Sequence, residues 1–197
     1  MIGDPPAYAA LSDGALMVLF ANGDPGASRV LAARLLPRAL RHAARVLGDR
    51  AEAEDVAQEA MLRLWRAAAG WQQDGAAQPA TWLYRVVANL CTDRLRRSGR
   101  TASLEDADLA RDGQPGVEDR LIEKGRMAAL DAALAHLPDR QRQAVVLRHI
   151  EGLSNPEIAA ILDLGVEAVE SLTARGKRAL AQALANSKEA LGYDDGP

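Results

Sequence analysis

SNPEIAAILDLGVEAVESLTARGKRALAQAL, residues 154 to 184, is the stretch of the sequence that decides the fold class. Ser154 and Glu157 form the S-x-x-E pattern of a capping box, and Pro156 falls in the first helical turn, where its missing N–H matters little. A short helix, a three-residue turn and a longer helix that begins at Val166 follow. This order and spacing predict a helix-turn-helix unit.

The longer helix has an apolar side and a polar side. Its apolar positions are Val166, Val169, Leu172, Gly176 and Leu180, and its outward positions are Glu167, Glu170, Ser171, Ala174, Arg175, Lys177 and Arg178. In a helix-turn-helix, such an outward face can reach base edges in the major groove while its cations neutralise phosphates. The residues alone leave a second interpretation open, in which the pair of helices is a packing unit and the cations only complement the helix dipole.

The rest of the chain predicts an all-α protein. Alanine and leucine are abundant and aromatic residues make up only 4% of the sequence, which favours helices packed through aliphatic stripes over sheets. Apolar spacing, capping residues and turn signals predict six further helices. They span about residues 12–22, 26–47, 51–69, 79–97, 117–137 and 139–151.

The predicted helices fall into two small domains joined by a flexible acidic linker. Residues 98–119 contain three glycines, one proline and most of the local acids, with little apolar periodicity. We therefore expect one domain at residues 1–97, a linker at 98–119, a second domain at 120–187 and a tail at 188–197. The net charge of −3 hides a segregation of sign. Residues 81–100 and residues 171–188 each carry +4, whereas residues 103–119 carry −5.

Several classes of function are disfavoured by the sequence. Cys91 is the only cysteine and the three histidines are not at ligand spacing, so we expect no disulfide, no metal site and no cofactor. Asp55 and Glu59 lie one helical turn apart, but no third ligand, histidine or nucleophile is placed to join them, which argues against an enzyme. The chain lacks a signal-peptide pattern and an apolar run of about 18 residues, so we expect a cytoplasmic protein without membrane insertion.

The segment from Trp71 to Arg97 is a candidate site for single-stranded DNA. A turn-rich loop precedes a helix that carries Trp82, Arg85, Asn89, Arg94, Arg96 and Arg97. Aromatic rings can stack on unpaired bases and arginines can follow the nucleic-acid backbone. The spacing also fits core tryptophans beside a solvated last turn, and it does not decide between the two interpretations.

Three motifs in order resemble the sigma-70 family of bacterial RNA polymerase subunits, in its small extracytoplasmic-function class. Residues 47–65 (LGDRAEAEDVAQEAMLRLW) are similar to the polymerase-binding helix of sigma region two. Residues 81–97 (TWLYRVVANLCTDRLRR) are similar to the segment that melts and reads the −10 element. Residues 137–148 (LPDRQRQAVVLR) and 152–159 (GLSNPEIA) are similar to region four, which binds the −35 element.

The resemblance implies roles for individual residues. Asp55, Gln58, Glu59 and Leu62 match the face that docks on core RNA polymerase. Trp82, Asn89 and Arg97, with the neighbouring Arg85, Arg94 and Arg96, match the −10 surface. Glu167, Glu170, Ser171 and Arg175, followed by Lys177 and Arg178, match the −35 recognition helix. The implied partners are core RNA polymerase, promoter DNA and an anti-sigma factor.

The sequence departs from the family pattern at three positions. Met61 stands where a phenylalanine is common, which is a tolerable apolar exchange. Gly165 replaces the usual serine or threonine cap before the recognition helix, at a cost of a few tenths of a kcal/mol. Leu172 stands where many members carry an arginine, so the −35 sequence is not readable from the family.

Two other functions remain open. A stand-alone helix-turn-helix regulator would bind its operator without polymerase, but the motif from Asp55 to Trp65 argues against it. A sigma-like mimic that titrates an anti-sigma factor would bind no DNA, but such mimics tend to lose the basic residues that this chain retains at positions such as Arg97 and Arg175.

Overall fold

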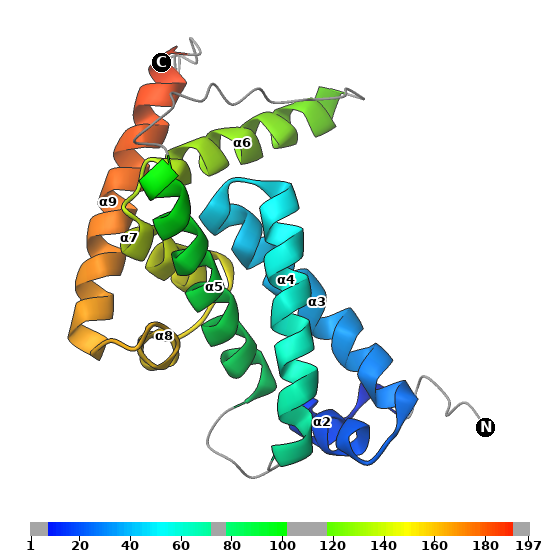
Figure 1. Ribbon diagram of the computed structural model, residues 1–197. Helices are drawn as coiled ribbons and strands as arrows, with labels where there is room; N and C mark the ends of the chain where they lie inside the picture. The colour runs from blue at the N-terminus through cyan, green and yellow to red at the C-terminus, as the bar shows by residue number, and fades with distance from the viewer. Residues whose placement is uncertain (1–7, 72–77, 102–117, 191–197) are drawn as a thin grey trace.

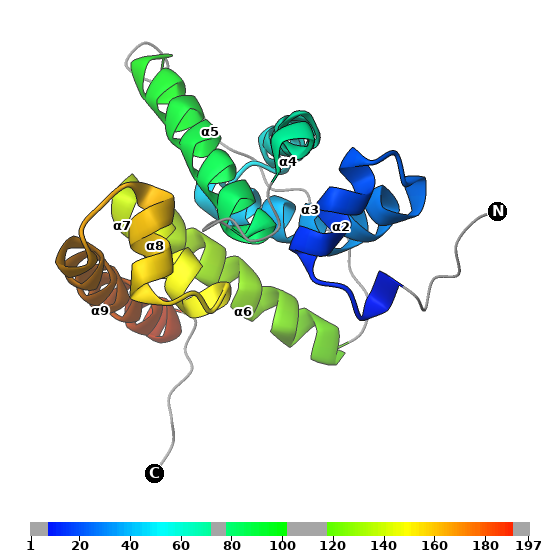
Figure 2. The same cartoon turned by 90° about the horizontal axis from the view of Figure 1, so that it is seen from below.

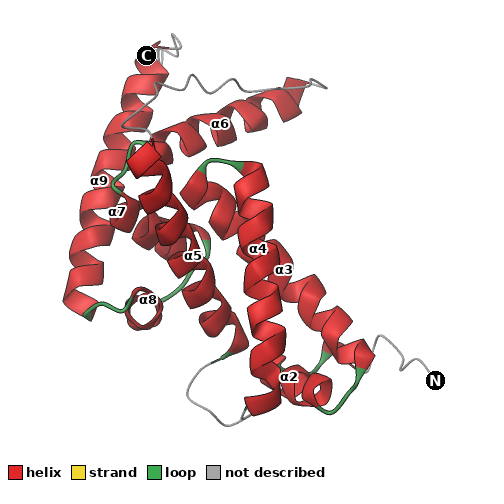
Figure 3. Cartoon of the chain, in the orientation of Figure 1, coloured by secondary structure: helices red, strands yellow, loops and turns green. Residues whose placement is uncertain are grey.

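The computed structural model describes residues 8–71, 78–101 and 118–190, and these residues are almost entirely helical (Figures 1 and 3). The prediction of an all-α fold is confirmed. Residues 102–117 of the predicted linker (98–119), the loop at 72–77 and residues 191–197 of the predicted tail (188–197) lie outside the described residues. The ends of these two predicted segments are helical, since 98–101 belong to α5, 118–119 to α6 and 188–190 to α9. The helices are α2 (Asp13–Ala21), α3 (Pro25–Leu47), α4 (Arg50–Ala67), α5 (Pro79–Thr101), α6 (Glu118–Ala135), α7 (Asp139–Val145), α8 (Asn155–Leu162) and α9 (Val166–Ala190).

Two short turns complete the set of elements. A 3₁₀ turn, η1 (Ala68–Gly70), follows α4, and a π-helical turn, η2 (Val146–Ile150), continues α7. The predicted helix at 139–151 therefore consists of α7 and η2 together. Helix α9 extends past the predicted end at Leu184, because residues 185–190 continue its pattern without a glycine or proline.

Local capping chemistry fixes where the helices begin and end. The side chains of Ser12, Asp24 and Asp49 accept hydrogen bonds from the first backbone N–H groups of α2, α3 and α4. The Ser154 N–H donates to the Glu157 carboxylate at 2.8 Å, which completes the predicted capping box of α8. Gly48 ends α3 in the left-handed conformation, with φ of 72°, where a side chain would be strained.

Helices α2 to α5 form the first bundle around one aliphatic core. Leu16, Leu31, Leu35, Val56 and Leu64 are fully buried there. Helix α4 packs along α3, and α5 contacts both of them (Figure 1). The bundle thus presents the outer faces of α4 and α5, which carry the predicted polymerase and −10 residues.

Helices α6 to α9, with η2, form the second bundle. Helix α7 crosses α9 at Gly176, where an added Cβ would lie 2.5 Å from the Val145 Cγ2 atom. A larger residue at this position would force Val145 or the helices themselves to shift. Short α8, a turn at Asp163 in the left-handed conformation and long α9 give the predicted helix-turn-helix arrangement.

The two bundles pack directly against each other (Figures 1 and 2). Helix α5 of the first bundle contacts α8 of the second, and α3 contacts α6 and η2. Within the described residues, no helix has both the length and the apolar character that crossing a membrane requires.

Candidate functional site

The outer face of α4 carries the predicted polymerase-binding residues. Asp55, Gln58 and Leu62 are exposed, Leu62 to 50%, and Glu59 is partly exposed. The Arg63 guanidinium donates to Glu59 at 2.8 Å, and this bond lowers the pKa of the Glu59 carboxyl. This face is apolar at Leu62 and polar around it, which is the composition typical of the centre and rim of a protein interface.

The outer face of α5 carries the predicted −10 residues, but they are not equally available. Arg85, Asn89, Arg96 and Arg97 are exposed, whereas Trp82 is half-buried and packs against the core of the first bundle. Arg94 is bound to α4 through an ion pair with Glu52.

Arg94 also lies 3.9 Å from the Asp55 carboxylate. It therefore connects the α5 face to the α4 face, a link that the sequence did not reveal. Arg96 forms an ion pair with Asp93 within α5.

The outward face of α9 is exposed to solvent. All six residues predicted for −35 recognition, Glu167, Glu170, Ser171, Arg175, Lys177 and Arg178, are exposed. The apolar stripe of this helix begins at Val169, which is fully buried, because Val166 is 40% exposed. The expectation that Val166 lies on the packed side is therefore only partly met, since the first turn extends past the second bundle.

A buried boundary between the two bundles is the main feature that sequence reasoning missed. Tyr84 and Ala88 of α5 are buried in one apolar cluster with Leu147, Ile158, Ala159, Ile161 and Val169. The Tyr84 hydroxyl donates to the Glu151 carboxylate at 2.5 Å, and the Arg41 guanidinium lies 3.5 Å from the same carboxylate. Burial and this hydrogen bond raise the pKa of Tyr84.

Arg142 joins the bundles at a second point. Its side chain is only 10% exposed, and it donates to the carbonyl oxygens of Val46 at 2.5 Å, Ala135 at 2.8 Å and Leu137 at 3.1 Å. These carbonyls lie at or just beyond the C-terminal ends of α3 and α6, where helices leave acceptors unpaired. The Gln143 amide adds a hydrogen bond of 3.0 Å to the Thr92 hydroxyl on α5.

His42 and Cys91 are buried in the first bundle. Neither ring nitrogen of His42 has a hydrogen-bond partner among the residues described, and the ring meets Tyr84 edge-on at 5.7 Å between centroids. Burial lowers the pKa of His42 to about 4 and raises the pKa of Cys91 to about 12. Among the described residues, no three histidine, cysteine, aspartate or glutamate side chains gather as metal ligands would.

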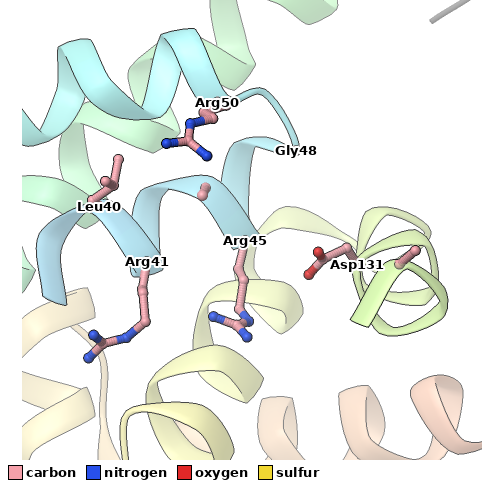
Figure 4. A pocket seen from close by; sticks show the side chains of 8 residues that line it. Leu40, Arg41, Arg45, Gly48, Arg50 and Asp131 are labelled. Atoms are coloured by element: carbon pink, nitrogen blue, oxygen red, sulfur yellow. The ribbon is translucent and has the colours of Figure 1, made fainter. Parts of the chain in front are cut away.

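A basic cleft of about 430 Å³ lies between α3 and α6. Figure 4 shows Arg41 and Arg45 extending from α3, with Asp131 on the neighbouring helix α6. None of the residues predicted to bind DNA or polymerase lines this cleft. It belongs to the boundary between the bundles, as Arg142 and Glu151 do.

The arrangement of these faces agrees with comparisons to known proteins. The profile of sigma-70 region 2 matches residues 31–101, which include the α4 and α5 faces. The profile of sigma-70 region 4 matches residues 127–180, which include the helix-turn-helix. The chain belongs to the sigma-70 family. The resemblance found in the sequence is thereby confirmed.

Individual relatives place this sigma-70 family member in the extracytoplasmic-function class. The ECF RNA polymerase sigma factor SigW of Bacillus subtilis is 33% identical over 153 residues, covering 71% of this chain and 79% of SigW. SigE of Mycolicibacterium smegmatis is 38% identical over 154 residues, covering 75% of this chain. The chain spans 58% of the length of SigE and 64% of the length of SigM of Mycobacterium tuberculosis.

Solved structures support the same fold. CnrH, determined in complex with the cytosolic domain of CnrY, superposes with a TM-score of 0.63 at 30% identity, covering 88% of this chain and 97% of CnrH. RpoE of Bartonella quintana, determined in complex with the anti-sigma factor NepR, gives a TM-score of 0.63 at 20% identity. It covers 79% of this chain and 95% of RpoE, and at that identity the likeness concerns the fold alone.

Proposed function

We propose that this protein binds core RNA polymerase and directs it to promoters by reading −10 and −35 elements. The observation that carries the proposal is that one chain exposes a polymerase-type face on α4 together with a helix-turn-helix face on α9. A stand-alone regulator needs only the second face.

Within this function, each face has its own task. The α4 face docks on the polymerase through Asp55, Gln58, Glu59 and Leu62. The α5 face captures bases of the −10 strand, with Trp82 and Asn89 at the bases and arginines along the backbone. The α9 face reads the −35 duplex in the major groove. The polymerase supplies the phosphodiester chemistry, so this subunit needs no catalytic site of its own and acts in the cytoplasm.

Promoter reading requires the two bundles to separate. Elements centred at −10 and −35 are about 25 base pairs apart, which is about 85 Å along B-form DNA at about 3.4 Å per base pair. In the structure, however, α5 and α8 share one apolar cluster and are in direct contact. We infer that the compact arrangement is the free form, and that residues 98–119 act as the linker between domains at 1–97 and 120–187.

A regulatory partner could act on the change between the compact and the open form. A protein that binds the compact form in preference to the open form would stabilise it by mass action and keep the subunit from the polymerase. An anti-sigma factor is the expected partner, since CnrH and the Bartonella RpoE were each determined with a protein partner, NepR being named an anti-sigma factor. The exposed arginines on α5 and α9 favour a DNA-binding subunit over a mimic that titrates such a factor.

Run-off transcription tests the proposal. Bacterial core polymerase is incubated with the full chain and a library of genomic promoters, and the wild type is compared with a Gln58→Ala/Glu59→Ala double variant. Glu54→Ala is the matched control, because Glu54 is exposed on the same helix but lies to one side of the docking face. We expect transcripts from a narrow promoter set, retained by Glu54→Ala and lost in the double variant. Absence of core-dependent transcripts with folded wild-type protein would refute the function.

A further inference from the structure

A polar hollow flanks the recognition helix and has no role in the function described so far. It has a volume of about 270 Å³ and lies between η2, the first residue of α8 and the middle of α9. Arg148, His149 and Lys177 bring cationic or titratable groups to it, and Asn155 and Glu170 face each other across it. Of the residues predicted to bind −35 DNA, only Glu170 and Lys177 line it.

The position of the hollow fits a backbone phosphate of duplex DNA. In a helix-turn-helix, the recognition helix enters the major groove while the start of the preceding helix lies against the sugar–phosphate backbone. Asn155 is the first residue of α8, so the partial positive charge of that helix end adds to the charges of Arg148 and Lys177. Both cations are exposed and lie near His149, whose pKa is lowered by burial and by these two charges.

Glu170 places a carboxylate in the same hollow. The Asn155 side-chain amide donates to the Glu170 carboxylate at 3.5 Å, so α9 and α8 are connected at this point. This bond is long and neutral on the donor side, and Glu170 has no ion-pair partner among the described side chains. A bound phosphate would therefore meet an uncompensated negative charge beside the two cations.

We propose that the hollow holds one phosphate of the −35 duplex between Arg148 and Lys177, and that Glu170 opposes this phosphate and so weakens −35 binding. The inference rests on the proposed function. Its consequence is that −35 affinity is set below what the cations alone would give, which makes promoter binding depend more strongly on the −10 contacts and on the polymerase. Glu170 thus acts as a tuning residue and not as a base reader.

Holoenzyme binding to a promoter found by the run-off assay tests the proposal. Dissociation constants are measured for the wild type and for Glu170→Gln at several salt concentrations. We expect Glu170→Gln to bind about three- to tenfold more tightly at low salt, with the gain shrinking as salt rises, because a charge–charge repulsion near the surface is removed. Lys177→Gln should weaken binding and reduce the salt slope by about one.

Asp131→Asn is the matched control. It makes the same change in net charge in the same bundle, but Asp131 is exposed on α6 in the cleft that faces α3. Its affinity should stay within about 1.5-fold of the wild type, since a charge beyond about 10 Å is largely screened. An equal gain in Asp131→Asn would attribute the effect to net charge and overturn the proposal.

Neutralising single phosphates identifies the contact. Methylphosphonate is introduced at one position at a time across the −35 duplex, and the binding of Glu170→Gln is compared with that of the wild type. We expect one position at which the gain of the variant disappears. A gain that is independent of every phosphate, or a relaxed preference for one base pair, would mean that Glu170 acts on a base edge and that the proposal is wrong. An unchanged affinity of Glu170→Gln on an active promoter would refute this inference alone, whereas a wild type without any promoter would refute the proposed function.

Discussion

Replacing Arg142 with methionine should separate the unfolding of the two bundles. Methionine keeps the apolar stem but removes the guanidinium, which donates to the carbonyls of Val46, Ala135 and Leu137. A hydrogen bond from a charged group contributes about 1.5–3 kcal/mol, and part of this is offset because a buried charge is removed as well. We expect the free energy of unfolding to fall by about 2–4 kcal/mol. Of the three hydrogen bonds, only the one to Val46 connects the second bundle to the first.

The chain carries a natural reporter for this test. All three tryptophans belong to the first bundle, so their fluorescence follows that bundle alone, whereas far-ultraviolet circular dichroism follows the helices of both. In urea, the two signals should coincide for the wild type. In Arg142→Met the dichroism should begin to fall at lower urea than the fluorescence, because the second bundle loses its contacts first.

Arg140→Met is the control for this prediction. Arg140 is exposed on the same helix two residues away, so its loss should change the free energy of unfolding by no more than about 0.5 kcal/mol. Coincident transitions in Arg142→Met, at a midpoint equal to that of Arg140→Met, would show that the arginine does not couple the bundles and would refute the reasoning.

Two further predictions concern buried positions. Because burial lowers the pKa of His42 from 6.5 to about 4, the unfolded chain binds the additional proton between these values, so stability should fall by about 2 kcal/mol from pH 8 to pH 5. Urea titrations at the two pH values check this, and His42→Leu should remove most of the difference while His149→Gln retains most of it. Gly176→Ala should lower the free energy of unfolding by about 1 kcal/mol, because overpacking against Val145 costs about 1–3 kcal/mol and exceeds the gain of about 1 kcal/mol in helix propensity. A variant as stable as the wild type would show that α7 and α9 separate without cost.

The local parts of the fold were predictable because their causes are local. The capping box at Ser154, the left-handed Gly48 and the breaks between helices depend on residues within one turn of each other. The helix-turn-helix followed from the same signals, and the outward face of α9 followed from helical periodicity. The face of α4 was implied only by the family resemblance, because periodicity groups Leu62 with the apolar stripe although it is 50% exposed. In these cases, residues that are close in the sequence are also close in space.

The boundary between the bundles was not predictable from the sequence. Arg142 reads as one of several polar residues in a short helix, yet its hydrogen bond reaches a carbonyl 96 positions away. Tyr84 lies among residues that match a DNA-reading helix, so its burial against η2 and α8 had no signal in the pattern. Arg94 similarly reads as a DNA contact, and only the fold shows its ion pair with Glu52, 42 positions earlier.

The apolar cluster between α5 and α8 has a consequence for protein engineering. A chimera could combine this first bundle with the second bundle of a relative, so that it recognises another −35 element. The incoming α8 would then have to fit Tyr84 and Ala88, which have no part in −35 recognition. In a chimera with a poor fit these side chains would be exposed. Such a protein would be prone to aggregate, or to start transcription without being held in the compact form, even if both halves read DNA well. Compatibility at the boundary between the bundles is therefore a selection criterion for donor sequences, separate from their promoter specificity.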